Sequence, residues 1–347
     1  DVLIHYPYQT FNYFIDLLRE AAIDPKVKSI KITIYRLASE SKVVNALINA
    51  AKNGKKVTVV IELQARFDEE NNIYWSNQLQ EEGVTVLHGL AGLKIHSKIC
   101  IISRKENNKL VNYCSIGTGN YNESTANLYS DFSLFTANTK ITIEVSKVFK
   151  IIEGKITPYY FKHLVLSPNN LRNKLVRLIN TEKRNALAGK PAYIYLKLNS
   201  LVDNDLITKL YQASKASVKI KLNIRGISSI IAGVEGLSEN IEAISILDKF
   251  LEHSRIYVFC NNDNPKYYIS SADWMVRNLD RRIEVTCPIY DKDIQQEIQD
   301  FLDIQFKDNV KARSLDKRLS NKYRDLPNDK PIRAQFALYD YYKSKLN

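Results

Sequence analysis

The sequence predicts an α/β protein of two similar domains, each a mixed, largely parallel sheet flanked by helices, with the two domains related by a pseudo-dyad. Three observations support this fold class. The chain has 347 residues, enough for two domains at ~100–200 residues per domain. Strand-like and helix-like patterns alternate along its first part, which favours parallel strands joined by helices. A His-x-Lys/Arg motif opens an apolar, strand-like run in each half, at His96 and at His253.

The first half carries the alternating signals in their clearest form. Apolar residues at helical spacing favour an opening helix, which Asp24-Pro25 ends because the residue before a proline disfavours helical backbone. Ser41 is expected to cap a second helix and Asn53-Gly54 to end it. In chain order we expect a helix over 9–22, strands over 30–35, 57–63 and 84–87, helices over 42–52 and 68–82 between them, a hairpin of strands 98–102 and 110–116, and a helix over 140–152.

The second half repeats this plan after a candidate boundary at 154–168. We therefore expect one domain over 1–155 and a second over 156–347. In chain order the second half is expected to contain a strand over 192–198, a helix over 203–214, a strand over 218–224, a long glycine-containing loop over 226–236 and a C-terminal helix over 332–346.

Arg36, Arg66 and Arg225 each follow the end of an expected strand. In open α/β sheets, ligands gather beyond the carboxyl ends of the parallel strands. Guanidinium groups suit phosphate because they can donate two parallel hydrogen bonds to its oxygens. The three arginines are therefore candidate phosphate-binding residues.

Each motif also places a cation two residues after its histidine. Lys98 follows His96, and Arg255 follows His253. In a strand, residues two apart point to the same face, so each histidine is expected to share a face with its cation. Both pairs are candidates for binding a negatively charged group.

The two motifs share a downstream pattern, in which a polar residue is followed by an acid at a fixed offset. Asn120 precedes Asp131 by 11 residues, and Asp273 precedes Glu284 by the same 11 residues. A common offset in two otherwise divergent segments indicates one module used twice. Two half-sites related by the pseudo-dyad would bring two histidines and several cations into one cleft.

His96 is expected to act as a nucleophile. A neutral imidazole can attack phosphorus and form a phosphoramidate, and neighbouring cations favour the neutral ring. An acid such as Asp131 or Glu284, bonded to the other ring nitrogen, would fix the tautomer. A lone histidine in a strand is more often structural, and it is the repetition with a matched offset that favours catalysis for His96 and His253.

The composition points to an anionic partner. Fifty Lys and Arg against thirty-eight Asp and Glu give a formal charge of +12, although a solvated basic face is the alternative. The four cysteines have no CxxC spacing and are expected to be buried free thiols in a reducing compartment. No apolar run approaches the ~20 residues of a transmembrane helix. A cytoplasmic location is expected, with peripheral association with the inner membrane as an alternative, and the chain reads as a fragment of a longer protein.

The two motifs resemble those of the phospholipase D superfamily, and nearly the whole chain resembles the two C-terminal domains of the bacterial polyphosphate kinase family. The matching stretches, in order, are Ile34-Tyr35-Arg36, the run from Glu62 to Asn72, Gly92 to Lys98, Gly117 to Asn122, Leu128 to Asp131, Asn199 to Asp203, Ile224 to Ile227, Gly236 to Asn240, Phe250 to Arg255, and Ala272 to Met275 with Arg277 to Arg282. So many matches in one order are not expected by chance.

The resemblance implies reversible transfer of the γ-phosphate of ATP to inorganic polyphosphate, with Mg²⁺. It implies that His96 is the phosphohistidine intermediate and that Tyr129, Arg225 and His253 contact the nucleotide phosphates. The asymmetry of the two motifs suggests that His253 donates to, or steadies, the leaving phosphate. Lys98, Arg255 and Asn120 are further candidate phosphate-binding residues. It associates Arg36 and Arg66 with the magnesium region, where cations are expected to bind the phosphate oxygens rather than the metal.

Two other functions remain open from the sequence. One is a phosphodiesterase or nuclease of the phospholipase D type, although the acid expected shortly after the Lys is absent from both motifs. The other is a non-catalytic module that binds a polyanion. The resemblance implies no nucleic-acid partner and favours a homo-oligomer, and a fragment without further domains is expected to bind ATP poorly and to turn over slowly.

Overall fold

The computed structural model describes residues 1–62, 69–90, 92–156, 160–324 and 330–346, and it divides into two compact units. The first unit comprises Asp1–Asn169 together with Arg281–Cys287. The second unit comprises Asn170–Asp280 together with Pro288–Asn347. The domain limits at 155 and 156 stay a prediction, as does the pseudo-dyad.

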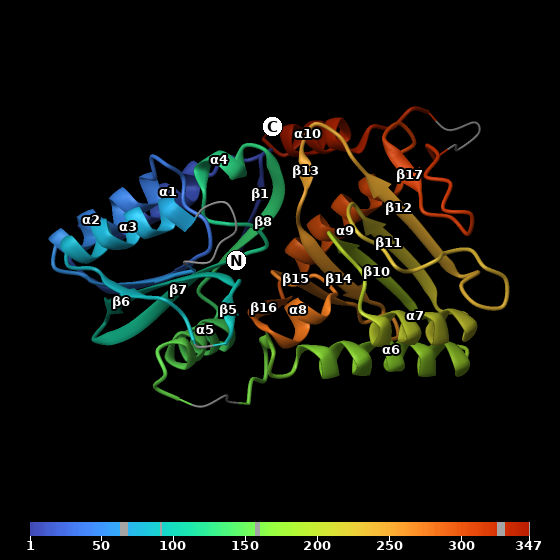
Figure 1. Cartoon of the computed structure of the whole chain (residues 1–347), viewed down its shortest axis with the longest axis horizontal. Helices are drawn as coiled ribbons and strands as arrows, with labels where there is room; N and C mark the ends of the chain where they lie inside the picture. Colours follow the sequence, from blue (N-terminus) through green and yellow to red (C-terminus); the bar gives the residue numbers. More distant parts are fainter. Residues whose placement is uncertain (63–68, 91, 157–159, 325–329, 347) are drawn as a thin grey trace. The chain divides into compact units, whose positions relative to one another are not determined.

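The first unit is built on one mixed sheet with the strand order β1-β8-β7-β6-β2-β3-β4. Its helices α1, α2 and α3 lie along one face of this sheet, and α5 lies on the other (Figure 1). The strands are β1 (Val2–Tyr6), β2 (Val27–Ile34), β3 (Lys56–Ile61), β4 (Thr85–Leu87), β6 (Lys98–Glu106), β7 (Lys109–Gly117) and β8 (Tyr129–Thr136), and the helices are α1 (Asn12–Ile23), α2 (Lys42–Lys52), α3 (Glu69–Glu81), α4 (Glu123–Ala126) and α5 (Thr139–Ile152).

Along this strand order, as far as the structure describes it, the parallel pairs are β2–β3 and β3–β4. The pairs β1–β8, β8–β7, β7–β6 and β6–β2 are antiparallel. The expected mixed sheet is confirmed, but its largely parallel character was wrong. The physical reason is the β6–β7 hairpin, whose two-residue turn at Asn107 and Asn108, both with positive φ, reverses the chain without a helical crossover.

The second unit repeats the same arrangement in the order β15-β14-β10-β11-β12. The pairs β10–β11 and β11–β12 are parallel, whereas β14–β10 and β14–β15 are antiparallel. Position by position this equals β7-β6-β2-β3-β4 of the first unit, so the repeated module inferred from the two motifs is confirmed. The strands here are β10 (Tyr193–Leu198), β11 (Lys219–Ile224), β12 (Ile241–Ile246), β14 (Arg255–Phe259) and β15 (Lys266–Ser270), with β17 (Ala312–Ser314) antiparallel to β12 and β13 (Leu251–Glu252) leading into the motif.

Helices cover the second sheet as they cover the first. Helices α6 (Leu171–Leu187) and α7 (Asn204–Lys215) lie side by side (Figure 1). The other helices of this unit are α8 (Val276–Asp280), α9 (Lys292–Phe306) and α10 (Ala334–Ser344). The sequence predicted α7 and α10, whereas α6 and α9 were not expected, because the apolar stripe of each is interrupted by many charged and amide side chains.

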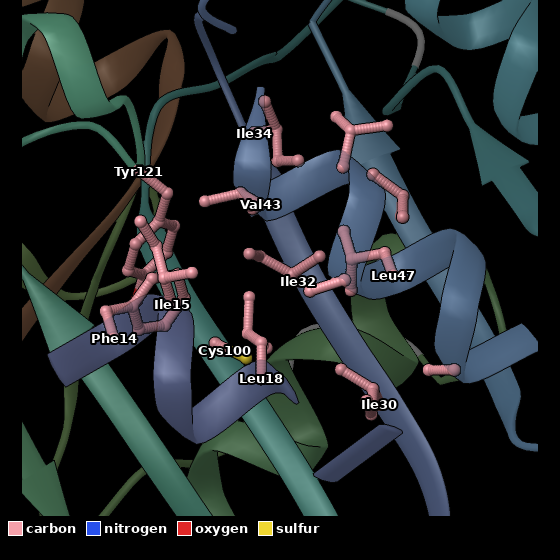
Figure 2. Packing of buried hydrophobic residues seen from close by; sticks show 14 of the residues in the cluster. Phe14, Ile15, Leu18, Ile30, Ile32, Ile34, Val43, Leu47, Cys100 and Tyr121 are labelled. Atoms are coloured by element: carbon pink, nitrogen blue, oxygen red, sulfur yellow. The ribbon is translucent and has the colours of Figure 1, made fainter. Parts of the chain in front are cut away.

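The core of the first unit forms where α1 and α2 pack on β2. Figure 2 shows Leu18 of α1, Ile32 of β2 and Leu47 of α2 pointing toward one another, and all three side chains are completely buried. Ser41 begins α2 as predicted, since its hydroxyl accepts a hydrogen bond from the main-chain N–H of Val44 at 3.2 Å. This packing fixes β2, whose carboxyl end is followed directly by Tyr35 and the candidate phosphate-binding residue Arg36.

All four cysteines are buried and free, as expected. Over the ranges that the structure describes, no helix combines the length and the apolar character needed to span a bilayer.

Glu182, on α6, is a buried carboxylic acid that accepts a hydrogen bond from the main-chain N–H of Asn261 at 2.7 Å. Burial raises the pKa of Glu182 from 4.5 to about 7. The folded state therefore holds this proton more tightly than the unfolded state does. Stability contributed at this site is complete below pH 4.5 and falls as the pH rises toward 7.

A Glu182→Gln variant is expected to be more stable than the unmodified protein at pH 8 by about 1–3 kcal/mol, since the amide keeps an acceptor oxygen without a charge. At pH 4.5 the two proteins should unfold at similar denaturant concentrations. Urea unfolding at both pH values measures the difference. Equal stability at pH 8 would contradict the proposed cost of ionising Glu182.

Candidate active site

His96 follows β5 (Lys94–Ile95) and is held by a strand that returns late in the chain, β16 (Arg282–Ile289). The main-chain N–H groups of His96 and Ser97 both donate to the carbonyl oxygen of Ile283, at 3.0 and 2.9 Å. Two successive donors on one acceptor are characteristic of a β-bulge, which redirects side chains at functional sites. The bulge therefore fixes where the His96 ring points.

Glu284, the next residue of β16, lies against the His96 ring. Its Oε1 and Oε2 atoms lie 2.8 and 2.9 Å from Nδ1 of His96, and the Glu284 side chain is completely buried. A carboxylate can only accept, so the hydrogen on the ring is placed on Nδ1 and the lone pair on Nε2. Of the two acids that the sequence offered for this role, Glu284 makes the contact with His96.

Tyr35 organises the other side of the His96 ring. The two rings meet edge to face, with centroids 4.9 Å apart and planes at 85°. The Lys98 ammonium nitrogen lies 5.4 Å from the centroid of the same tyrosine ring, and the Arg36 guanidinium carbon lies 5.9 Å from it. One aromatic side chain thus gathers the candidate nucleophile and two cations, an arrangement that suits a phosphoryl group.

Buried polar side chains fix the backbone around this group. The Asn72 amide donates to the carbonyl oxygens of Tyr35 and Glu62, at 3.0 and 2.9 Å. Glu62 in turn accepts from the main-chain N–H of Ile95 at 3.1 Å, directly before His96. Thr33 donates to the carbonyl oxygen of Ser97 at 2.7 Å. These contacts tie the ends of β2 and β3 to the histidine.

The loop after β7 contributes polar groups close to the start of β8. Thr118 donates to Oδ1 of Asp131 at 2.6 Å. A Cβ on Gly119 would lie 2.1 Å from Oδ2 of Asp131, so this position requires glycine. Asn120 carries a buried amide oxygen to which no described residue donates, and such a group is typical of a position that meets water or a ligand.

The second unit builds its own polar cluster around the second motif. Arg255 donates to Oδ2 of Asp273 at 3.0 Å and to the carbonyl oxygen of His253 at 2.8 Å. The main-chain N–H groups of Asn199 and Ser200 donate to Oδ1 of Asp273, at 2.8 and 3.1 Å. Asp273 therefore joins the end of β10 to the motif cation.

Arg225 reaches this cluster from the end of β11. Its Nε donates to the side-chain oxygen of Asn199 at 2.6 Å. The His253 ring is half-buried, and Nε2 and Nδ1 lie 3.3 and 3.4 Å from a guanidinium nitrogen of Arg255. Within the second unit, the structure therefore brings together His253, Arg255 and, through Asn199, Arg225.

Asp273 is strongly acidic despite its burial. Burial acts to raise its pKa, but the charge and hydrogen bond of Arg255 and the two main-chain donors outweigh this and lower the pKa from 3.8 to about 2. A depressed pKa means that the ionised carboxylate stabilises the fold above pH 3.8. This stabilisation is lost as the pH falls through about 2.

An Asp273→Ala variant is expected to lose about 3–5 kcal/mol of stability at neutral pH, because it leaves the buried Arg255 without its carboxylate. The loss should shrink below pH 3.8, where the unmodified protein also loses this contribution. Urea unfolding at pH 7 and pH 2 tests both statements. Asp340→Ala, at an exposed position of α10, is the control; a comparable loss in that variant would contradict the assignment.

The site residues predicted from the sequence fall into three groups. His96, Lys98 and Arg36 lie around one tyrosine ring in the first unit. The members of the second-unit cluster are His253, Arg255 and Arg225. Tyr129 begins β8 and Asn120 lies in the preceding loop, while Arg66 lies outside the described residues. Whether the two histidines serve one reaction remains a prediction.

The sequence analysis missed several residues that build the site. The missed side chains are Thr33, Tyr35, Glu62, Asn72, Lys197 and Glu252. Tyr35 and Glu62 follow strands directly, so the rule that pointed to Arg36 could have found them. Lys197 interrupts an apolar strand, which is a signal for a buried, paired charge. Asn72 gave no signal, because it stands in an ordinary run of polar helix residues.

The described residues do not form a dedicated magnesium site. Over the described ranges, no three His, Cys, Asp or Glu side chains come together in a way that could hold a metal ion. Glu69 and Glu70 lie in the first turn of α3, where acidic side chains are favoured by the helix dipole. Arg36 is itself a cation and cannot ligate Mg²⁺.

Two family models together match most of the chain. Polyphosphate kinase C-terminal domain 1 matches residues 1–158, and polyphosphate kinase C-terminal domain 2 matches residues 164–335. The chain belongs to the polyphosphate kinase family. Polyphosphate kinases are also among its similar curated proteins, with 54% identity to that of Vibrio cholerae and 53% to that of Escherichia coli K12, each over 99% of this chain.

The structural comparison supports the same assignment. A crystal structure of polyphosphate kinase from Porphyromonas gingivalis matches 99% of this chain with a TM-score of 0.93 and 42% identity. The phosphatidylserine synthase of Haemophilus influenzae matches 99% of the chain with a TM-score of 0.60 at 10% identity, which shows a shared fold alone. The chain spans about half the length of the polyphosphate kinases that it matches, 49% of the Vibrio and 53% of the Porphyromonas protein.

Proposed function

We propose that this chain carries the phosphotransfer site of a polyphosphate kinase, which transfers the γ-phosphate of ATP reversibly to inorganic polyphosphate. The observation that carries the proposal is the buried contact between His96 and Glu284, which leaves Nε2 of the histidine as the nucleophilic atom. Membership in the polyphosphate kinase family supports the choice of substrates.

The proposed first step is attack by Nε2 of His96 on the γ-phosphorus of ATP. A P–N bond forms, the bond from phosphorus to the bridging oxygen breaks, and ADP leaves with that oxygen and its electron pair. The imidazole becomes positively charged when Nε2 bonds phosphorus. The carboxylate of Glu284 at Nδ1 stabilises this charge, while Lys98 and Arg36 bind the transferring oxygens.

The second step returns the phosphoryl group to oxygen. A terminal oxygen of polyphosphate attacks the phosphorus, a P–O bond forms and the P–N bond breaks, so His96 is restored as a neutral imidazole. ADP can take the place of polyphosphate, which makes the reaction reversible. Lys98 and Arg36 again hold the phosphoryl oxygens in line with the attacking and leaving atoms.

We propose roles in the same reaction for residues of the second unit. Arg225 and Arg255 are cations suited to the nucleotide phosphates, and His253 is suited to donate a proton to the leaving phosphate oxygen. Tyr129 and Asn120 of the first unit are proposed as further phosphate contacts. Support comes from their positions at strand ends and in the loop after β7, together with the family assignment.

Magnesium is proposed as the partner of the nucleotide phosphates rather than an ion held by protein carboxylates. It would neutralise charge on the phosphate oxygens, which Arg36 and Arg66 are also proposed to bind. No step above depends on a metal held by the protein. A cytoplasmic location, a homo-oligomeric state and peripheral association with the inner membrane remain predictions.

Incubation with ATP labelled at the γ-phosphate tests the proposal. The expected result is an acid-labile, base-stable label that maps to the peptide containing His96 and moves to ADP when ADP is added in excess. The Vibrio cholerae polyphosphate kinase, treated in parallel, is the positive control. Because this chain is expected to bind ATP poorly, the ATP concentration is raised until labelling no longer increases. A label on serine, or no label on this chain at any ATP concentration when the Vibrio enzyme is labelled, would contradict the proposal.

The same assay separates the alternatives. A phosphodiesterase of the phospholipase D type would release product from a phosphodiester substrate and would not pass the γ-phosphate back to ADP. A polyanion-binding module would retain polyphosphate on a filter without any covalent label. Tyr35 meets the His96 ring edge to face and also lies close to the cations of Lys98 and Arg36. This arrangement places positive charge around the nucleophile and therefore favours the transferase.

A further inference from the structure

The first turn of α10 is attached by three successive residues to two segments of the second unit, the stretch before β13 and the turn after α9. Arg333, just before the helix, donates to both carboxylate oxygens of Asp248, at 2.5 and 2.8 Å. The main-chain N–H of Ala334 donates to Asp308 at 2.7 Å. Gln335 reaches the segment that leads into the second motif. The start of α10 is therefore fixed relative to β13.

Gln335 uses its whole amide group for this purpose. Its side-chain oxygen accepts from the main-chain N–H of Phe250 at 2.9 Å, and its nitrogen donates to the carbonyl oxygen of Phe250 at 2.9 Å. The same nitrogen donates to the side chain of Glu252 at 2.8 Å. One buried side chain thus contacts the main chain just before β13 and the side chain of its last residue, Glu252, which directly precedes His253.

Glu252 continues this network into the sheet. Its other carboxylate oxygen lies 3.1 Å from the ammonium group of Lys197, and each of the two side chains is only 1% exposed. Lys197 also donates to the carbonyl oxygen of Ser254, at 3.4 Å. The chain of contacts Gln335–Glu252–Lys197 therefore holds the main chain on both sides of His253.

The first unit performs the equivalent task with neutral groups. Ile32 pairs with Cys100 and Leu196 with Tyr257, each four residues after its motif histidine, so Thr33 and Lys197 are equivalent as the next residues of their strands. The Thr33 hydroxyl donates to the carbonyl oxygen of Ser97. A hydroxyl needs no counter-ion, whereas a buried ammonium group does. The charged version in the second unit is thus dependent on Glu252, and Glu252 on Gln335.

We infer that Gln335 is a positioning residue for His253, acting through Glu252 and Lys197 and through the main chain of Phe250. The inference rests on the proposed function, in which His253 assists transfer at the leaving phosphate. Gln335 touches neither substrate nor reacting atoms. Its role is to hold the backbone that presents the imidazole, so that the ring meets the phosphate without reorganisation.

The test compares Gln335→Ala and Gln335→Glu with Gln295→Ala in this chain. Gln295 is a matched control, because it is a buried glutamine of α9 that donates to the main-chain carbonyl of Ile289 at 2.7 Å. Two quantities are measured for each variant. One is the set of kcat and KM values for return of phosphate from polyphosphate to ADP, and the other is the titration of the His253 ring followed by NMR.

Both Gln335 variants are expected to lower kcat roughly 10- to 100-fold with a smaller change in KM, as misplacement of a reacting group does. The His253 titration should shift or broaden in both. Gln295→Ala should match Gln335→Ala in thermal stability without either effect. Unchanged kcat and unchanged His253 titration in Gln335→Ala would overturn the inference.

A His253→Ala variant separates the inference from the function on which it rests. If His253→Ala keeps full kcat, the proposed role of His253 fails whatever Gln335 does. If His253→Ala loses kcat but Gln335→Ala does not, the positioning role fails and the proposed function stands. A loss in both variants, with the NMR shift in Gln335→Ala, supports the two together.

Discussion

A His96→Gln variant is expected to lose the acid-labile label and the transfer of phosphate to polyphosphate or ADP, with a fall of at least about 10⁴-fold, to the background of the assay. The reason is that an amide has no lone pair suited to attack phosphorus, while the neighbouring cations remain in place. Label incorporation after incubation with γ-labelled ATP measures the loss. Polyphosphate binding, measured on a filter, should change little, because Lys98 and Arg36 are retained.

The exposed His88 provides the control for this substitution. His88→Gln removes the same side-chain type from the first unit at a position outside the site, and it should be labelled like the unmodified protein. Label retained in His96→Gln but lost in His88→Gln would move the phosphohistidine elsewhere. Loss of polyphosphate binding together with the label would indicate that His96→Gln disturbs the fold rather than the chemistry.

Local sequence signals were sufficient for the elements that determine the repeated module. Hydrophobic periodicity and a cap at Ser41 predicted α2, and short strand-like apolar runs predicted β2, β3, β10 and β11 close to their observed limits. These signals depend on neighbours along the chain, which the sequence contains. They fail for α6, in which five basic residues break the apolar stripe, because tertiary burial of one face outweighs local composition there.

Strand direction was not predictable in the same way. The pattern of strand, helix and strand near β2 and β3 is correct for parallel pairing, but the sheet continues on its other side through β6, β7 and β8. The hairpin turn at Asn107 reverses the chain between β6 and β7. The sequence of a strand does not by itself determine which neighbouring strand it pairs with. The prediction of a largely parallel sheet applied the strand–helix–strand pattern of β2, β3 and β4 to every strand of the sheet, including β6, β7 and β8, which pair antiparallel.

The site shows the same division between local and distant information. His96 and Lys98 could be found because the motif is contiguous and repeated. The offset that linked Asp273 to Glu284 identified Glu284 as a candidate acid, but did not show that it serves His96 from a strand that returns to the first unit 188 residues later.

Because residues 281–287 belong to the first unit, Glu284 contacts the first motif histidine, His96. Strand β16 contributes both the Ile283 carbonyl that accepts from the His96 and Ser97 main chain and the carboxylate that holds Nδ1. Backbone and side chain of two adjacent residues thus position one imidazole. If the ring turned over, Nε2 would face Glu284 and Nδ1 would be the free nitrogen, so the ring orientation decides which nitrogen can attack. The tautomer and the ring orientation are therefore the same requirement.

Glu284→Gln is expected to lower the rate of His96 labelling by about 10²–10⁴-fold, comparable to the effect of replacing the carboxylate by an amide in serine proteases. The amide can present its NH₂ group to Nδ1, which places the ring hydrogen on Nε2 and blocks attack. It also removes the negative charge that stabilises the phosphorylated ring. Glu284→Asp should recover part of the rate, because it keeps the charge at a longer distance. Rapid-quench measurement of label formation gives these rates, and Glu284→Gln labelled as fast as the unmodified protein would show that the buried carboxylate has no part in activating His96.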